Sequence, residues 1–399
     1  MIAREKRVSH TDGPTSSLKD LMTGWRHDFH LHPELGFNEH RTANKVADLL
    51  ASFGMEVHTG LGRTGVVGVL QKGNATRSIG LRADMDALPI SETGDVAYRS
   101  ANDGVMHACG HDGHTSMLLG AAKHLSENGN FNGRVVFIFQ PNEEYGLGAA
   151  AMLDDGLFDR FGVDEVHGMH NIPGMETGTF ASRANAITAS ESLFEIEISA
   201  QGGHAALPHM GVDAIMVGSE IVGALQTIVS RKLNPSLNGV VSVTEFESDG
   251  RRNVLPGKAI LRGDARALSP EINQVTEMHM RRIVDGICAA HGVIATVSYD
   301  TIFPATINAA SATRSAVHAA QAMVGVAAVD GDCPPKLFSE DFAHLAAARP
   351  GCFMLMGNGT QGAHAKALHS SDYNFNDDVL VPGSSYWVTL VEQQLSESA

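Results

Sequence analysis

The sequence has few cysteines, few basic residues and no long apolar run. Its four cysteines in 399 residues show no paired spacing, which excludes a disulfide framework and suits a reducing compartment. No stretch reaches the about 20 apolar residues of a transmembrane helix, and residues 1–17 contain no signal-peptide core. The net charge of −16 argues against nucleic acid and anionic membranes as partners. We therefore expect a cytoplasmic protein that attracts any anionic substrate with local positive charge, such as a metal ion or an arginine.

Buried strands alternate with amphipathic helices at both ends of the chain. Residues 134–139 read Arg-Val-Val-Phe-Ile-Phe, and such an apolar run is typical of a strand covered on both faces. This alternation predicts a layered α/β domain. The predicted helices are 18–30, 39–53, 116–125, 310–324, 340–348 and one at the C-terminus; the predicted strands are 65–70, 78–82, 134–139, 165–169 and 352–356.

The pattern changes near Ala186. Residues 193–200 alternate strictly between apolar and polar side chains, which indicates a sheet with one face exposed to water. The predicted order of strand, helix, strand, strand, helix and strand is the split ferredoxin-like unit. The α/β pattern then returns, so we predict a catalytic domain of residues 1–186 and 303–399 with an inserted domain of residues 187–302. The elements of the insertion are 193–200, 212–231, 239–247, 258–267, 270–291 and 293–299.

Residues 106–115 read Met-His-Ala-Cys-Gly-His-Asp-Gly-His-Thr and are predicted to be a loop before the helix 116–125. The N-terminus of a helix lowers the pKa of a nearby thiol, which favours a thiolate at Cys109. Thiolate and imidazole are good ligands for zinc-like ions, so Cys109 and His111 are candidate metal ligands. A buried structural cysteine beside a solvated histidine would give the same pattern.

Four more candidate residues lie near predicted strand ends or the last helix. Glu143 and Glu144 follow a buried strand, where ligands bind in open α/β sheets, and one carboxylate could hold a metal while the other moves a proton. His170 ends another strand, and His369 lies in a polar stretch before the last helix. Each also fits a structural role: an acid pair at a helix N-terminus, a satisfied loop histidine or an exposed turn.

Together, these segments resemble the dinuclear metal amidohydrolases of the hippurate hydrolase, aminoacylase and indoleacetyl-amino-acid hydrolase type. The resemblance covers nearly the whole chain and implies that the insertion is a lid and dimerisation domain. The matching segments are residues 26–34, 82–89, 107–112, 140–141 with 143–144, 202–204, 253–256 and 339–342.

The resemblance implies two divalent metal ions, zinc or manganese first, with cobalt or nickel as alternatives. It implies that Glu143 is the general base for a metal-bound hydroxide, and that Asp86 orients a ligand. The implied ligands are Cys109, His111, Glu144, His170 and His369. Five ligands are too many for one catalytic zinc and agree with two ions that share a ligand.

The resemblance also implies roles for the inserted domain. His204 would stabilise the oxyanion in the active site of a partner subunit, so we expect a homodimer or a dimer-based oligomer. Asn253 and Arg266 match positions that bind the substrate carboxylate, for which a guanidinium is well shaped. Without the resemblance, His204 reads as a turn histidine and Arg266 as an exposed arginine on a strand.

The chain departs from the usual family pattern at three positions. Asn142 stands where a small residue is usual, Ser371 where proline is common, and Asn374 where aspartate is common. These positions bear on the shape of the pocket and on substrate preference more than on the metal ligands.

We therefore predict hydrolysis of the amide bond of an N-acyl or N-aroyl amino acid to a carboxylic acid and a free amino acid. The alternatives with the same metal site are a dipeptidase, a carboxypeptidase and an aryl-amine hydrolase. Two further alternatives are a metal-free amidase with Cys109 as the nucleophile and a non-catalytic binding protein on the same scaffold.

Overall fold

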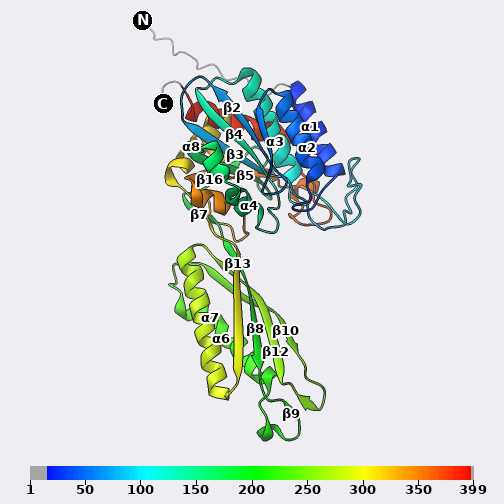
Figure 1. Ribbon diagram of the computed structural model, residues 1–399, viewed down its shortest axis with the longest axis vertical. Helices are drawn as coiled ribbons and strands as arrows, with labels where there is room; N and C mark the ends of the chain where they lie inside the picture. Colours follow the sequence, from blue (N-terminus) through cyan, green and yellow to red (C-terminus); the bar gives the residue numbers. More distant parts are fainter. Residues whose placement is uncertain (1–15, 397–399) are drawn as a thin grey trace.

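The computed structural model describes residues 16–396, which form two larger sheets with their helices and two short two-stranded sheets (Figure 1). The predicted N-terminal tail, residues 1–17, lies almost wholly outside this range. No helix within residues 16–396 combines the length and the apolar character needed to cross a bilayer.

The larger sheet has eight strands in the order β1-β2-β4-β3-β5-β16-β6-β15. Its four central strands run parallel and are almost wholly buried. These are β4 (Gly133–Gln140), β3 (Ser78–Asp84), β5 (Glu165–Pro173) and β16 (Gly351–Gly359). The edges are β1 (Glu56–Leu61) and β2 (Gly65–Lys72) on one side, and β6 (Phe180–Ala181) and β15 (Val329–Asp330) on the other.

Strand β4 shows why an unbroken apolar run is needed here. Val135, Phe137 and Phe139 belong to one hydrophobic cluster, whereas Val136 and Ile138 belong to another. Because successive side chains of a strand point to opposite faces, both faces of this strand are covered by helices.

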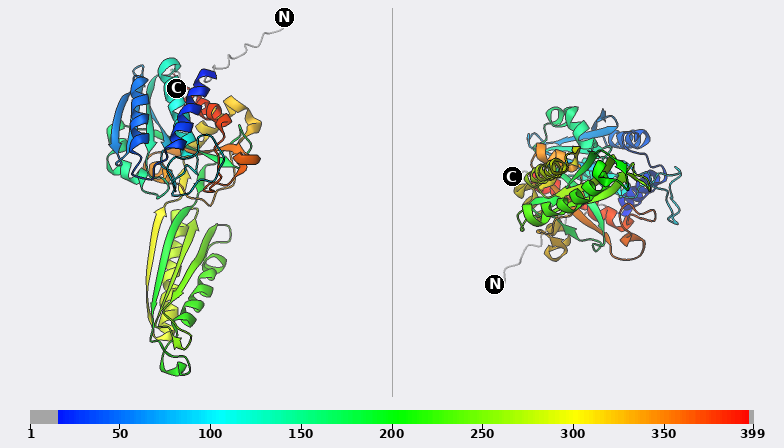
Figure 2. Two further views of the ribbon diagram at one scale, coloured as in Figure 1. Left: turned by 90° about the vertical axis from the view of Figure 1, so that its right-hand side faces the viewer. Right: turned by 90° about the horizontal axis from the view of Figure 1, so that it is seen from below.

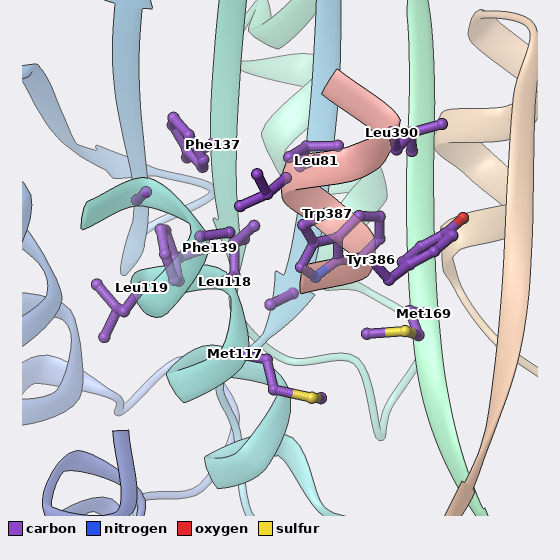
Figure 3. Close-up of a cluster of buried hydrophobic side chains, with 14 of the residues drawn as sticks. Leu81, Met117, Leu118, Leu119, Phe137, Phe139, Met169, Tyr386, Trp387 and Leu390 are labelled. Carbon is purple, nitrogen blue, oxygen red and sulfur yellow. The ribbon is translucent and has the colours of Figure 1, made fainter. Parts of the chain in front are cut away.

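The first of these clusters joins the sheet to helices α1 (Ser16–Leu31), α2 (His40–Ser52), α3 (His111–Asn128), α8 (Ala310–Val324) and α10 (Leu380–Gln394). Figure 3 shows its centre, where Leu118 of α3 and Trp387 of α10 lie over Leu81 and Phe139 of the sheet. The second cluster packs α4 (Gly148–Asp154), α5 (Leu157–Phe161) and α9 (Phe342–Ala348) on the other face.

The inserted part is an antiparallel sheet in the order β10-β12-β8-β13, with two helices. Its elements are β8 (Ser190–Ser199), α6 (Ala214–Thr227), β10 (Gly239–Ser248), β12 (Lys258–Ala267), α7 (Pro270–His291) and β13 (Ile294–Phe303). A third cluster, with Ile196, Ile198 and Val217, joins one face of this sheet to α6 and α7. The predicted class, an α/β domain with an inserted ferredoxin-like domain, is confirmed.

The insertion projects from the larger part, and a short ribbon lies at its far tip (Figures 1 and 2). This ribbon pairs β9 (Gly203–His204) with β11 (Val254–Leu255). At the near end, β7 (Asn185–Thr188) pairs with β14 (Thr306–Asn308), and the hydroxyl of Thr188 donates to that of Thr306 at 2.7 Å. The remaining short helical turns are η1 (Pro208–Met210), η2 (Ile228–Lys232), η3 (Val326–Ala328), η4 (Gly362–Ala365) and η5 (Asp377–Val379).

One predicted boundary was wrong in a way that matters for the site. Helix α3 begins at His111, five residues before the predicted start at Ser116. The prediction followed the apolar spacing, but the first turns of α3 are polar and buried, with His111, Asp112 and His114 among them. Most of the histidine-rich motif is therefore helical, and only its first part is a loop.

Candidate metal centre

The carboxyl ends of neighbouring parallel strands bring the candidate ligands together. Glu144 follows β4 and His170 lies in β5, while Cys109 and His111 flank the start of α3. The ligand atoms of Cys109, His111 and His170 all lie within 4.8 Å of one another, and the same holds for Cys109, Glu144 and His369. The two groups share Cys109, whose Sγ lies 3.3 Å from His170 Nε2.

Gly110 makes the tight turn between Cys109 and His111. Its φ is +101°, a left-handed conformation that side chains disfavour, and a Cβ here would lie 2.3 Å from Asn171 Oδ1. A glycine is therefore required where the chain turns from the cysteine into the helix.

Asp86 holds two of the candidate ligands in place. His111 Nδ1 donates to the backbone oxygen of Asp86 at 2.9 Å and lies 3.2 Å from its carboxylate. The other carboxylate oxygen of Asp86 accepts a hydrogen bond from the backbone N–H of Glu144 at 3.1 Å. Because Nδ1 is the donor, Nε2 is the nitrogen of His111 that is free to bind a metal ion.

The two remaining histidines differ in their surroundings. His170 is buried, and its Nδ1 donates to the backbone oxygen of Asn171 at 2.7 Å, so that Nε2 faces Cys109. The side chain of His369 is 52% exposed, and its Nε2 lies 3.4 Å from Glu144 Oε2.

The donors fit divalent metal ions. His111 Nε2 and Glu144 Oε1 are buried without hydrogen-bond partners and lie 3.8 Å apart. Burial, and then the charges of Glu144 and Glu143, raise the pKa of the Cys109 thiol well above its usual value. The expectation that the helix N-terminus would lower this pKa was wrong, because burial and the neighbouring carboxylates raise it. A thiolate here needs a cation beside it, and sulfur, imidazole and carboxylate together suit a transition metal ion.

Sequence reasoning missed a buried charge network beneath the site. Arg82 Nη1 donates to Asp84 at 2.7 Å, and its Nη2 donates to Glu340 at 2.8 Å and to Asp341 at 3.0 Å. The carboxylates of Glu340, Asp341 and Glu143 lie within 4.8 Å of one another. Burial, and then the charges of Glu340 and Glu144, raise the pKa of Glu143 well above its usual value. The only signal in the sequence was that two matching segments, 82–89 and 339–342, contain charged residues.

The structure does not bring the three candidates of the inserted domain to this site together. His204 and Asn253 are neighbours in the tip ribbon, where the N–H of Ala205 donates to the backbone oxygen of Asn253 at 3.1 Å. Arg266 lies near the other end of β12, eight positions along the strand from Lys258, a distance of about 26 Å. Within one chain, Asn253 and Arg266 therefore do not meet one carboxylate.

Arg266 already has partners where the inserted part meets the larger one. Its guanidinium donates to Ser339 Oγ at 2.7 Å, to Glu191 at 2.7 Å and to Asp264 at 2.8 Å. Ser339 precedes Glu340, so Arg266 reaches the edge of the charge network.

Comparison with known proteins places these features in context. The model of peptidase family M20/M25/M40 matches residues 80–393. The hippurate hydrolase of Campylobacter jejuni is 40% identical over 370 residues, which are 93% of this chain and 95% of that protein. Thermostable carboxypeptidase 2 of Saccharolobus solfataricus is 35% identical over 384 residues, 94% of this chain and 96% of that protein. A crystal structure of a Bacillus subtilis protein, described as a dinuclear metal binding peptidase from the M20 family, is 30% identical with a TM-score of 0.83; the match covers 96% of this chain and 99% of that one.

Proposed function

Because the chain belongs to peptidase family M20/M25/M40, we propose that it hydrolyses the amide bond of N-acyl or N-aroyl amino acids with divalent metal ions. The observation that carries the proposal is the pair of ligand groups that share Cys109. The proposal is supported by the similarity to hippurate hydrolase, because hippurate is an aroyl amino acid.

In this proposal, Cys109, His111 and His170 hold one ion, and Cys109, Glu144 and His369 hold the second. Such ions polarise an amide carbonyl and lower the pKa of water. Sulfur and imidazole donors favour zinc, manganese, cobalt or nickel over magnesium and calcium.

Glu143 is the residue that moves the proton. Its side chain is buried, and burial together with the charges of Glu340 and Glu144 raises its pKa. Glu143 would take a proton from the attacking water and deliver it to the leaving nitrogen. Arg82, which lowers the pKa of Glu143, limits this rise.

His204 and Asn253 would act from a second copy of the chain, so that the working unit is a homodimer. Strand β9, which contains His204, lies at the far tip of the insertion (Figure 1), and Asn253 lies beside this strand. His204 Nδ1 accepts a hydrogen bond from the N–H of Ala206 at 3.0 Å, which leaves the proton on Nε2. An exposed Nε2–H is suited to stabilise an oxyanion. Arg266 would bind the substrate carboxylate in its own subunit by exchanging one of its present partners.

The four cysteines are unpaired and buried, which supports a cytoplasmic location as part of the proposal. The metal-free alternative has weaker support. Burial raises the pKa of Cys109, and burial together with His114 lowers that of His170, so this thiol and imidazole stay neutral rather than forming a reactive ion pair.

Metal analysis and a substrate panel test the proposal. The purified protein is expected to hold two divalent ions per chain, to lose activity after dialysis against EDTA, and to regain it with Mn²⁺ or Zn²⁺. The panel compares N-benzoylglycine and N-acetyl amino acids with dipeptides, N-benzoyl dipeptides and anilides. Full activity after exhaustive chelation would overturn the metal mechanism in favour of the thiol amidase.

A second candidate function is a carboxypeptidase on the same metal centre. The similarity to thermostable carboxypeptidase 2 favours it, since that match also spans nearly both chains. Faster release of the C-terminal residue from N-benzoyl dipeptides than of glycine from N-benzoylglycine would select this candidate.

A further inference from the structure

His369 differs from the other four candidate ligands in how it is held. The others are buried or almost so, with side chains at most 7% exposed, whereas the side chain of His369 is 52% exposed. Its φ of +64° is uncommon for a residue with a side chain, and such a conformation persists only where the surroundings fix it. It lies outside any regular element, between η4 and η5. Its position therefore depends on contacts made by the loop that carries it, residues 366–376.

A second irregular segment, residues 89–105, contacts this loop; we call it the clasp. Its two ends are joined by a pair of backbone hydrogen bonds between Leu88 and Met106, each 3.0 Å long. The N–H of Thr93 donates to the backbone oxygen of Ser371 at 2.7 Å, and the hydroxyls of these two residues lie 2.9 Å apart. The hydroxyl of Tyr98 donates to Asn374 Oδ1 at 3.0 Å.

The clasp is in turn held by helix α1. The ring of Tyr98 stacks on His27 at 3.8 Å between centroids, and the guanidinium of Arg26 lies 4.1 Å from the Tyr98 centroid. Glu92 of the clasp lies 3.2 Å from His30 Nε2.

The other nitrogen of His30 lies 2.8 Å from the carboxylate of Asp112, the residue after His111. Helix α1 thus supports the α3 turn that carries His111 and, through the clasp, the loop that carries His369.

We propose that Tyr98 and Thr93 are positioning residues that fix His369 in the metal centre. This inference rests on the proposed function, in which Glu144 and His369 hold the second ion. Ser371 and Asn374, two of the positions at which the chain departs from the usual family pattern, are the clasp's partners. The clasp therefore helps to fix the position of His369, the candidate ligand that is least enclosed by the protein.

The test compares hydroxyl deletions in the clasp with matched deletions in the inserted domain. Tyr98→Phe keeps the ring and removes the hydrogen bond to Asn374. Its control is Tyr299→Phe, since the Tyr299 hydroxyl donates to Asn273 Oδ1 at 2.7 Å. Thr93→Val has the control Thr301→Val, because Thr301 Oγ1 lies 2.9 Å from Ser192 Oγ.

The measurement is a titration of each metal-free protein with Mn²⁺, in which the free ion is followed by electron paramagnetic resonance. Tyr98→Phe is expected to raise the dissociation constant of one of the two Mn²⁺ ions by about 3- to 10-fold, the value of one hydrogen bond, while the other changes little. Thr93→Val is expected to raise the same dissociation constant by about 2-fold, because the backbone hydrogen bond to Ser371 remains. Both control variants are expected to bind Mn²⁺ as the wild type does.

A further pair of variants protects the test against poor folding of Tyr98→Phe. Asn374→Asp keeps the acceptor oxygen and should bind Mn²⁺ as the wild type does, whereas Asn374→Leu should match Tyr98→Phe. Unchanged affinities in Tyr98→Phe and Asn374→Leu, or an equal loss at both ions, would overturn the positioning role. A wild-type protein that binds none of Mn²⁺, Zn²⁺, Co²⁺ and Ni²⁺ would overturn the proposed function itself, and this inference with it.

Discussion

The two parts of the molecule use their charged residues in opposite ways. In the larger part, Arg82 is fully buried and shared among three carboxylates that adjoin the metal centre. In the inserted part, Arg262 is likewise shared among three carboxylates, but all of them lie on the exposed face of the sheet.

This contrast separates two tasks. The buried network costs desolvation free energy, and its role is to shape the candidate metal centre. The exposed network contributes little to the free energy of unfolding. The core of the inserted part is instead built from apolar side chains.

The largest expected effect is on catalysis. Glu143→Gln is expected to lower kcat by about 10²- to 10⁴-fold, because the amide cannot take a proton from water. The control is Glu195→Gln, which removes an exposed partner of Arg262 and should change kcat by less than about 2-fold. Steady-state kinetics on N-benzoylglycine check both, and a Glu143→Gln enzyme as fast as the wild type would contradict the assigned proton transfer.

The next effect is on stability. Arg82→Met is expected to lower the free energy of unfolding by about 3–5 kcal/mol, because three buried carboxylates lose their cation. Urea denaturation monitored by circular dichroism measures the change. A decrease of less than about 1 kcal/mol in the free energy of unfolding would show that the buried network is no more important for stability than the exposed one.

A pH-dependent effect should follow from Glu39. This side chain is buried, and burial, followed by the charge of Asp86, raises its pKa from 4.5 to about 7. Between these two values the folded state holds a proton that the unfolded state has lost, so this group's contribution to stability falls as the pH rises from 4.5 to 7.

Between pH 4.5 and 7, the free energy of unfolding of the wild type should therefore fall by roughly 1–3 kcal/mol relative to that of Glu39→Gln. Urea denaturation at a series of pH values compares the two proteins. A constant difference between them would show that Glu39 titrates normally.

The smallest effect is expected in the inserted part. Arg262→Met should lower the free energy of unfolding far less than Arg82→Met does, and the loss should shrink further in 1 M NaCl because salt screens exposed charges. The same denaturation experiment, with and without salt, measures both. A loss as large as that of Arg82→Met would mean that the two networks are equivalent.

Sequence reasoning succeeded where local signals determine structure. The predicted bounds of α7 match the observed Pro270–His291, since the side chain of Ser269 caps its first turn and Gly292 ends it in a left-handed conformation. The apolar run in residues 134–139 likewise predicted β4 correctly as a strand covered on both faces.

Sequence reasoning failed where the structure depends on contacts between residues that are far apart in the sequence. Arg82 and Glu340 are 258 positions apart, and no local pattern shows that they meet. The clasp was missed for the same reason, because Tyr98 and Asn374 are 276 positions apart and neither lies in a periodic segment. Only the two departures from the usual family pattern, at Ser371 and Asn374, hinted at an altered neighbourhood.

The pairing of β7 with β14 has a mechanical consequence. The strands leading into and out of the insertion run side by side at one end, and the hydroxyls of Thr188 and Thr306 join them. Strand β8 alone extends about 33 Å beyond this point. A rotation of about 10° at this pairing would therefore move the far end of β8 through about 6 Å.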